Sequence, residues 1–336
     1  MGVAHVSRTE DTVVAPTRRS GRRVRIAAVV GATALLAGTF TYFNTDVFSA
    51  DRICHGWATP DQVSDALGSG WGRVVASEDS STTCSVRQES WLPGQSGKLL
   101  NLYVDTEEAD FPFKDRVWEV SGSRHVMTGG THGAYDDNGG WALLPQACTS
   151  TARGDGPQAV LHAAVTEGTS EGDAAGIGRL LASASQALTS GPDGCGTANS
   201  ATTTTHYLAP SVLHDSDLDK VCGIPGFRLG KVTGSTGQKM QEQTTGTPAE
   251  GLYCDLTFEG DKEGPFARLA IVNDAWLVKP LKKRSFTRVD CDGRPAVFAD
   301  DLRHWEPKER AARGLPDDAG LAKAFGDAAR EALHCD

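Results

Sequence analysis

The sequence has little basic charge outside its first 25 residues. Of its 336 residues, 33 are Lys or Arg and 43 are Asp or Glu, so the formal net charge is −10. Six arginines against two acidic residues give residues 1–25 about +4, which leaves about −14 on the remainder. Nucleic acids and anionic membrane surfaces both attract basic protein surfaces. The acidic body therefore argues against nucleic acid as a partner and matches an anionic membrane surface poorly.

Catalytic signatures are missing as well. The chain contains no G-x-S-x-G nucleophile elbow, no H-E-x-x-H zinc motif, no S-x-x-K and no P-loop. The densest polar cluster, GGTHGAYDDNGG at 129–140, offers His132, Asp136 and Asp137 as metal ligands on paper. Asp-Asn-Gly-Gly is turn chemistry, which favours a hairpin or loop there. We therefore predict no catalytic centre, no cofactor and no metal.

No two cysteines form a C-x-x-C pair, the spacing typical of redox or metal sites. The cysteines are even in number and widely spaced, which is typical of disulfides in an oxidising compartment. We predict a structural role for all eight, namely Cys54, Cys84, Cys148, Cys195, Cys222, Cys254, Cys291 and Cys335.

An apolar run near the N-terminus supplies the export route that such disulfides need. Residues 26–43 carry no charge, arginines precede them, and Asp46 and Asp51 follow. The run would span roughly 27 Å as a helix, close to a hydrocarbon core of about 30 Å. With the positive-inside rule, we predict a cytoplasmic Arg-rich tail at 1–25 and a transmembrane helix at 26–45. The protein would then be a single-pass cell-membrane protein whose C-terminal region lies on the extracytoplasmic side.

Two further possibilities concern this run. The alternative to an anchor is a signal peptide cleaved near Phe48-Ser49-Ala50, which would yield a secreted protein. Small residues spaced four, three and four apart share one helix face and would allow close packing of two helices. We therefore consider a homodimer through Ala27, Gly31, Ala34 and Gly38.

The rest of the chain resembles one module written twice. The cysteine gaps are 30, 64 and 47 in the first half and 32, 37 and 44 in the second. TTCSVRQE and LYCDLTFE each place a cysteine early in an alternating strand pattern. We predict module 1 at 46–195, a Ser/Thr-rich linker at 196–216 and module 2 at 217–336. Residues 235–251 look like a long polar loop inside module 2.

Helices and strands complete the predicted fold. Helical patterns at 173–188 and 317–333 each precede the last cysteine of a module, with Asp173 and Asp317 or Asp318 as N-caps. TPDQVSDALG has a capping box from Thr59 and Gln62 and a stop at Gly68. Further strands are expected at 98–106, 140–147, 159–165, 267–272 and 275–281. We predict α+β architecture, with two tandem disulfide-stapled modules, each an antiparallel sheet with packed helices.

The repeated frame also favours one set of disulfides. Four cysteines within a module allow three pairings, and sequence alone does not choose among them. If connectivity repeats with the module, the simplest pairs are sequential, Cys54–Cys84 and Cys148–Cys195, then Cys222–Cys254 and Cys291–Cys335.

Tryptophans are the candidate binding residues. Five of the seven lie in module 1, and Trp57, Trp71 and Trp91 could form part of a binding surface for a sugar or a partner. The alternative, more typical of tryptophan, is that they fill the core and cover the disulfides.

The stretch Cys54…TPDQVSDALG…Cys84 resembles the DUF3558-like group of actinobacterial exported envelope proteins. Modules of that group begin with a cysteine, a short helix ending in Leu-Gly and a second cysteine in a strand. The resemblance covers mainly residues 54–86, and the usual lipid-attachment cysteine is absent here. The group has no established activity, so the resemblance implies location and architecture alone.

These observations together predict a non-enzymatic, single-pass envelope protein. Its extracytoplasmic modules would bind a wall component, a small ligand or an envelope protein partner. The alternatives are an extracytoplasmic hydrolase acting on the cell envelope, and a membrane sensor or scaffold.

Overall fold

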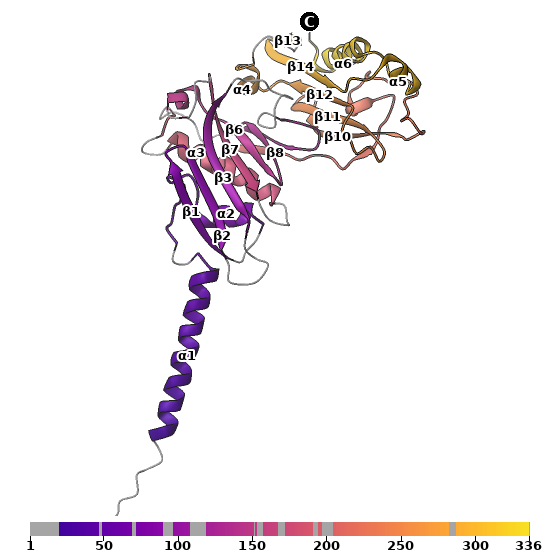
Figure 1. Ribbon diagram of the computed structural model, residues 1–336. Coiled ribbons are helices and arrows are strands. Elements are labelled where there is room, and N and C mark those ends of the chain that lie inside the picture. The colour runs from indigo at the N-terminus through magenta and orange to yellow at the C-terminus, as the bar shows by residue number, and fades with distance from the viewer. Residues whose placement is uncertain are drawn as a thin grey trace, which may run out of the picture.

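The computed structural model contains two lobes and a separate N-terminal helix (Figure 1). The residues that it describes are 20–46, 49–68, 72–89, 97–107, 119–150, 152, 157–166, 172–190, 194–196, 204–281 and 287–335. Helix α1 (Ser20–Asn44) extends away from the first lobe, and Tyr42 near its end packs under the Arg73 guanidinium, 4.7 Å from the ring centroid.

The first lobe is an antiparallel sheet covered by helices on one face. Its order within the described residues is β1-β2-β3-β7-β6-β5-β4-β8. Helix α2 (Pro60–Ala66) and helix α3 (Ala174–Ser190) pack on this sheet and on each other. The strands are β1 (Arg73–Ser80), β2 (Thr83–Glu89), β3 (Leu99–Glu107), β4 (His125–Gly129), β5 (Gly133–Asp136), β6 (Gly139–Leu143), β7 (Gln158–Thr166) and β8 (Thr205–Leu208).

The helix signals in the sequence act as predicted. The Thr59 hydroxyl accepts from the Gln62 N–H, and the Gln62 side chain accepts in return from the Thr59 N–H, which completes the capping box of α2. One face of α3 buries Ile177, Leu180 and Leu181 against the sheet.

The second lobe repeats this plan on a smaller scale. Its sheet order is β13-β14-β12-β11-β10-β9 in the described residues, and helix α6 (Asp318–Leu333) covers one face. Asp317 caps α6 through the Gly320 N–H. The other elements are β9 (His214–Asp215), β10 (Met240–Thr247), β11 (Gly251–Phe258), β12 (Ala267–Val272), α4 (Ala275–Val278), β13 (Thr287–Cys291), β14 (Arg294–Leu302) and α5 (Pro307–Ala312).

The two sheets share one order of five strands. In the first, β1, β2 and β3 form a meander, β7 lies beside β3, and β6 lies outside β7. In the second, β10, β11, β12, β14 and β13 follow the same order. Along the chain, the first module has two additional strands, β4 and β5, between β3 and β6, and in the sheet they lie outside β6. These two strands fall within the middle cysteine gap, which is longer in the first module than in the second. The hypothesis of a duplicated module predicts this correspondence.

All eight cysteines are bonded, in the sequential pairs that the repeated spacing favours: Cys54–Cys84, Cys148–Cys195, Cys222–Cys254 and Cys291–Cys335. The first pair of each module ties its opening segment to the second strand of the sheet. The second pair of the second module ties the end of β13 to the residue after α6. Four disulfides fit an extracytoplasmic or secreted protein.

The transmembrane helix predicted at 26–45 is corrected by the structure. Within the described part of the chain, no helix is both long enough and apolar enough to cross a membrane. The described residues therefore do not support the transmembrane helix predicted at 26–45.

Three polar or short segments also differ from the predictions. A linker is predicted at 196–216, but its residues 204–216 supply β8 to the first sheet and β9 to the second. The predicted polar loop at 235–251 contains β10, whose strand bonds are made with β11 and β9. The predicted strand at 275–281 begins as helix α4 because the Asp274 carboxylate accepts from the Trp276 N–H as an N-cap.

The two lobes meet over a third hydrophobic core. It lies on the outer faces of both sheets, opposite the helix-covered faces. We call this contact region the junction. Its buried residues are Val120, Val126, Ala134, Trp141, Leu143 and Val160 from the first module and Tyr253, Ala270, Val272, Leu277, Val278, Leu281, Val297 and Ala299 from the second.

Candidate functional site

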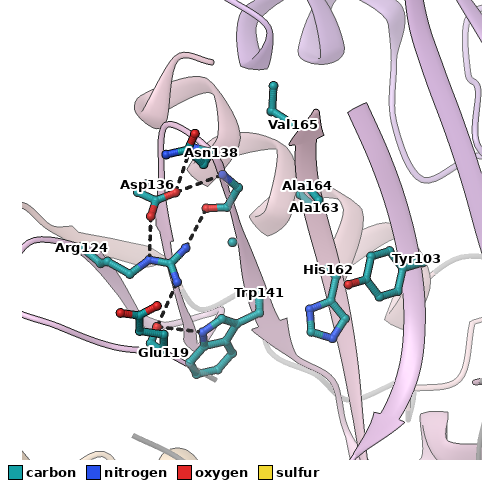
Figure 2. Close-up of a pocket in the computed structure, with 12 residues that line it drawn as sticks. Tyr103, Glu119, Arg124, Asp136, Asn138, Trp141, His162, Ala163, Ala164 and Val165 are labelled. Atoms are coloured by element: carbon teal, nitrogen blue, oxygen red, sulfur yellow. Dashed lines mark hydrogen bonds and ion pairs between the residues drawn. The ribbon is translucent and has the colours of Figure 1, made fainter. Parts of the chain in front are cut away.

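A polar cavity of about 510 Å³ opens on the outer face of the first sheet, next to the junction (Figure 2). Strands β3, β6 and β7, the end of β5 and the segment before β4 contribute to it. Its described lining residues are Tyr103, Glu119, Arg124, Asp136, Asn138, Gly139, Gly140, Trp141, His162, Ala163, Ala164 and Val165.

The hollow arises from two neighbouring rows of side chains across the sheet. Tyr103, His162 and Trp141 are direct cross-strand partners on β3, β7 and β6, so they form one aromatic row on the same face. The Tyr103 and His162 rings stack with their centroids 4.7 Å apart. In the next row, Ala164 pairs with Gly139. Because alanine has only a methyl group and glycine has no side chain, this row leaves space beside the aromatic row.

Arg124 forms the polar wall of the cavity. Its side chain is 9% exposed, and it makes contacts through all three guanidinium nitrogens. Nε lies 3.1 Å from Asp136 Oδ2, Nη1 donates to the Glu119 carbonyl at 3.2 Å, and Nη2 donates to the Gly139 carbonyl at 3.1 Å. Figure 2 shows these bonds converging on the one guanidinium. The wall is therefore rigidly held.

Asp136 owes its position to the hairpin between β5 and β6. Its Oδ1 accepts from the N–H groups of Asn138 and Gly139 at 2.9 and 3.1 Å, which closes the turn. Gly139 has φ near +145°, and a Cβ there would lie 2.2 Å from the Ala163 carbonyl oxygen, so only glycine fits. The hairpin that the sequence predicts at 129–140 is confirmed.

Glu119 connects the cavity to the second module. Its Oε1 lies 2.9 Å from Arg268 Nη1 on β12, and its carbonyl accepts from Trp141 Nε1 at 3.2 Å. On the other side of the aromatic row, His162 Nε2 lies 3.0 Å from Glu107 Oε1. Glu107, Glu119 and Asp136 thus each have a cationic or imidazole partner that fixes the orientation of the carboxylate.

The arrangement suits binding better than bond cleavage. Glu119 and Asp136 are each paired with a guanidinium group, which fixes their oxygens as hydrogen-bond acceptors at the cavity. Tyr103 adds a half-buried aromatic ring beside these acceptors, and the buried His162 and Trp141 continue the row behind it. A cavity of this size falls in the usual range for small-molecule sites, about 300–1,000 Å³.

The residues singled out from the sequence lie mostly elsewhere. Trp57 is 6% exposed and belongs to the core of the first module, so its predicted surface role is wrong. Trp71 and Trp91 lie outside the described residues. His132 Nδ1 lies 2.6 Å from Asp274 Oδ2, and among the described residues no group of three or more His, Cys, Asp or Glu side chains could hold a metal ion. Gly31 and Gly38 lie on open sides of α1, and the homodimer stays a prediction.

Sequence reasoning missed the cavity because its residues come from five separate segments. His162 stands in the apolar run of β7 and is 3% exposed, so nothing in its own segment distinguishes it from a core residue. The alternation of Asn101, Tyr103 and Asp105 with buried leucines was the available signal, since it marks an outer sheet face rich in polar and aromatic groups.

Comparisons with known proteins return no counterpart. No protein-family model matches the chain, and neither a curated protein nor a solved structure matches it.

Proposed function

We propose that the protein is a non-catalytic, extracytoplasmic binding protein whose cavity accepts a small neutral saccharide of the cell wall. The carrying observation is the half-buried Tyr103 ring, backed by the buried His162 and Trp141, beside the fixed carboxylates Glu119 and Asp136. Sugar rings present C–H faces that pack on aromatic rings, and their hydroxyl groups donate to carboxylates.

The charge balance supports a neutral ligand. Glu119 is offset by Arg268 and Asp136 by Arg124, so the wall carries matched pairs. A strongly anionic ligand would meet the two carboxylates, and a strongly cationic one would meet the Arg124 guanidinium. A ligand with many hydroxyl or amide groups and no net charge avoids both costs.

Titration calorimetry with N,N′-diacetylchitobiose, cellobiose and maltose tests this function. At least one disaccharide is expected to bind, and Tyr103→Ala is expected to weaken that binding about tenfold by removing part of the aromatic surface. Tyr207→Ala is the matched control, because Tyr207 is a 44% exposed tyrosine on β8 outside the cavity lining. Absence of heat with all three sugars, or equal losses in the two variants, would contradict the proposal.

An envelope hydrolase is the second candidate, and the presence of two carboxylates in one cavity is what favours it. Incubation of the protein with peptidoglycan should then release new reducing ends, and Asp136→Asn should abolish that release. We expect no release, because both carboxylates are bonded to guanidinium groups.

A further inference from the structure

The wall segment 119–124 of the cavity is held from behind by the second module. Glu119 and Arg124, at its two ends, both line the cavity. On β10, the fully buried Thr245 places its hydroxyl 3.1 Å from the Gly122 carbonyl oxygen and 2.9 Å from that of Arg124. A buried polar side chain is kept in place by such bonds, so the two modules are fixed relative to one another here.

The backbones of the two modules are also in direct contact at Gly122. A Cβ on this residue would lie 2.0 Å from the Gln243 carbonyl oxygen and 2.7 Å from the Asp255 nitrogen. Any side chain would therefore separate the segment from β10 and β11. The absence of a side chain is what lets the wall segment approach the second sheet.

Arg268 makes a further contact, and it does so among three carboxylates. Its cross-strand partners are Asp255 on β11 and Asp301 on β14, which lie on the same face of the sheet. Its guanidinium reaches across the junction to Glu119. Arg268 thus holds Glu119, a cavity residue of the first module. Asp255 and Asp301 on its own sheet are competing acceptors for the same guanidinium group.

We propose that the second module positions the ligand-binding wall of the first, with Arg268 as the positioning residue that holds Glu119. This inference rests on the function proposed above, since it assigns a role within the same cavity. Ligand binding in the first module then depends on how firmly the second module is docked against the wall segment 119–124. Arg268 acts through Glu119 and does not itself line the cavity.

Asp255 makes this control sensitive to pH. Its side chain faces Arg268 from β12, Glu119 and Ser123 from the wall segment, and Gln243 from β10. Burial raises its pKa to about 6, while the Gly122 N–H and Arg268 act in the opposite direction. Above that pH the Asp255 carboxylate competes with Glu119 for Arg268. Below it the neutral acid no longer competes, and Arg268 is left to Glu119.

Calorimetry with N,N′-diacetylchitobiose on the full chain tests the inference. Arg268→Met is expected to weaken binding about tenfold, and Arg268→Lys to restore part of it. The wild type should bind several-fold more tightly at pH 5 than at pH 7.5, whereas Asp255→Asn should bind equally at both. Lys239→Met is the control, since it removes an exposed ion pair with Asp215 elsewhere in the second module.

Hydrogen exchange of residues 119–124 provides a readout that needs no sugar. Faster exchange in Arg268→Met and in Gly122→Ala, with no change in Lys239→Met, is the expected result. If the wild type binds the sugar and Arg268→Met binds it equally, the inference is overturned and the proposed function stands. If the wild type binds no sugar, the proposed function fails, and unchanged exchange in Arg268→Met overturns the inference as well.

Discussion

His132 of the first module and Asp274 of the second lie 2.6 Å apart, from Nδ1 to Oδ2, across the junction. Both side chains are largely buried, and the His132 ring also stacks on Trp276 with centroids 5.4 Å apart. The other oxygen of the same carboxylate caps α4. One side chain therefore starts a helix and joins two modules.

Replacing Asp274 should cost more stability than replacing a cap alone. Asp274→Ala removes both the cap and the contact with His132, and we expect a loss of about 2–4 kcal/mol in the free energy of unfolding. Asp317→Ala removes only the cap of α6 and should cost about 1 kcal/mol. Urea denaturation of both variants gives the comparison. Equal losses would mean that the contact across the junction adds no stability.

The buried Asp255 carboxyl predicts a defined pH dependence of stability. Its pKa is raised in the folded state from 3.8 to about 6, chiefly by burial. A group with a raised pKa favours the folded state below its unfolded pKa, and that advantage is lost as the pH rises through 6.

Asp255→Asn isolates this effect, because it keeps the shape and removes the titration. At pH 7.5 the variant should be more stable than the wild type by up to about 3 kcal/mol. The difference should shrink as the pH falls from 6 and vanish near 4. Denaturation curves of the two proteins across this range measure it, and a constant difference would rule out the assignment.

Two helix glycines should respond oppositely to alanine. A Cβ on Gly178 in α3 would lie 2.5 Å from Tyr135 Cζ, so Gly178→Ala should force α3 from β5 and cost about 1–3 kcal/mol. Gly326 in α6 has no atom closer than 3.9 Å to the same position, the nearest being Arg330 Nη1. Gly326→Ala should therefore stabilise by about 0.5–1 kcal/mol. Thermal denaturation gives the sign of each change, which is the decisive result.

The disulfide between Cys148 and Cys195 closes a 47-residue separation that contains β7 and α3. Replacing both cysteines with alanine should lower the free energy of unfolding by about 4 kcal/mol in the chain-entropy description. Equilibrium denaturation followed by tryptophan fluorescence measures the loss. Peptide mass spectrometry without reduction should recover the other three sequential pairs unchanged, and a pair across the modules would contradict the fold.

The sequence predicts those parts of the fold where side chains alone determine the local structure. The Thr59 capping box, the apolar face of α3 and the alternating strands around Cys84 and Cys254 are all formed as predicted. The sequential disulfides that the repeated spacing favours are present, and their connectivity follows the repeated strand order.

The missed strands are polar, and they form for reasons outside their own segments. β10 buries Glu242 and Thr245, and these are stabilised by partners far along the chain, Cys222 for the first and Gly122 and Arg124 for the second. No periodic pattern in 235–251 contains that information. The cavity was missed for the same reason, since its walls meet only when the sheet forms and the second module docks.

The short stretch 204–216 has a practical consequence for anyone who cuts the protein in two. It pairs with β4 through β8, bonds to Thr244 through Ser211, and reaches β10 through β9. A cleavage before β8 removes the outermost strand from the first sheet, and a cleavage after β9 removes the outermost strand from the second; either exposes bare backbone amides and carbonyls there. Halves of the protein that are cut at either place and expressed separately should therefore aggregate through the unpaired strand edge. They should regain their solubility when they are mixed.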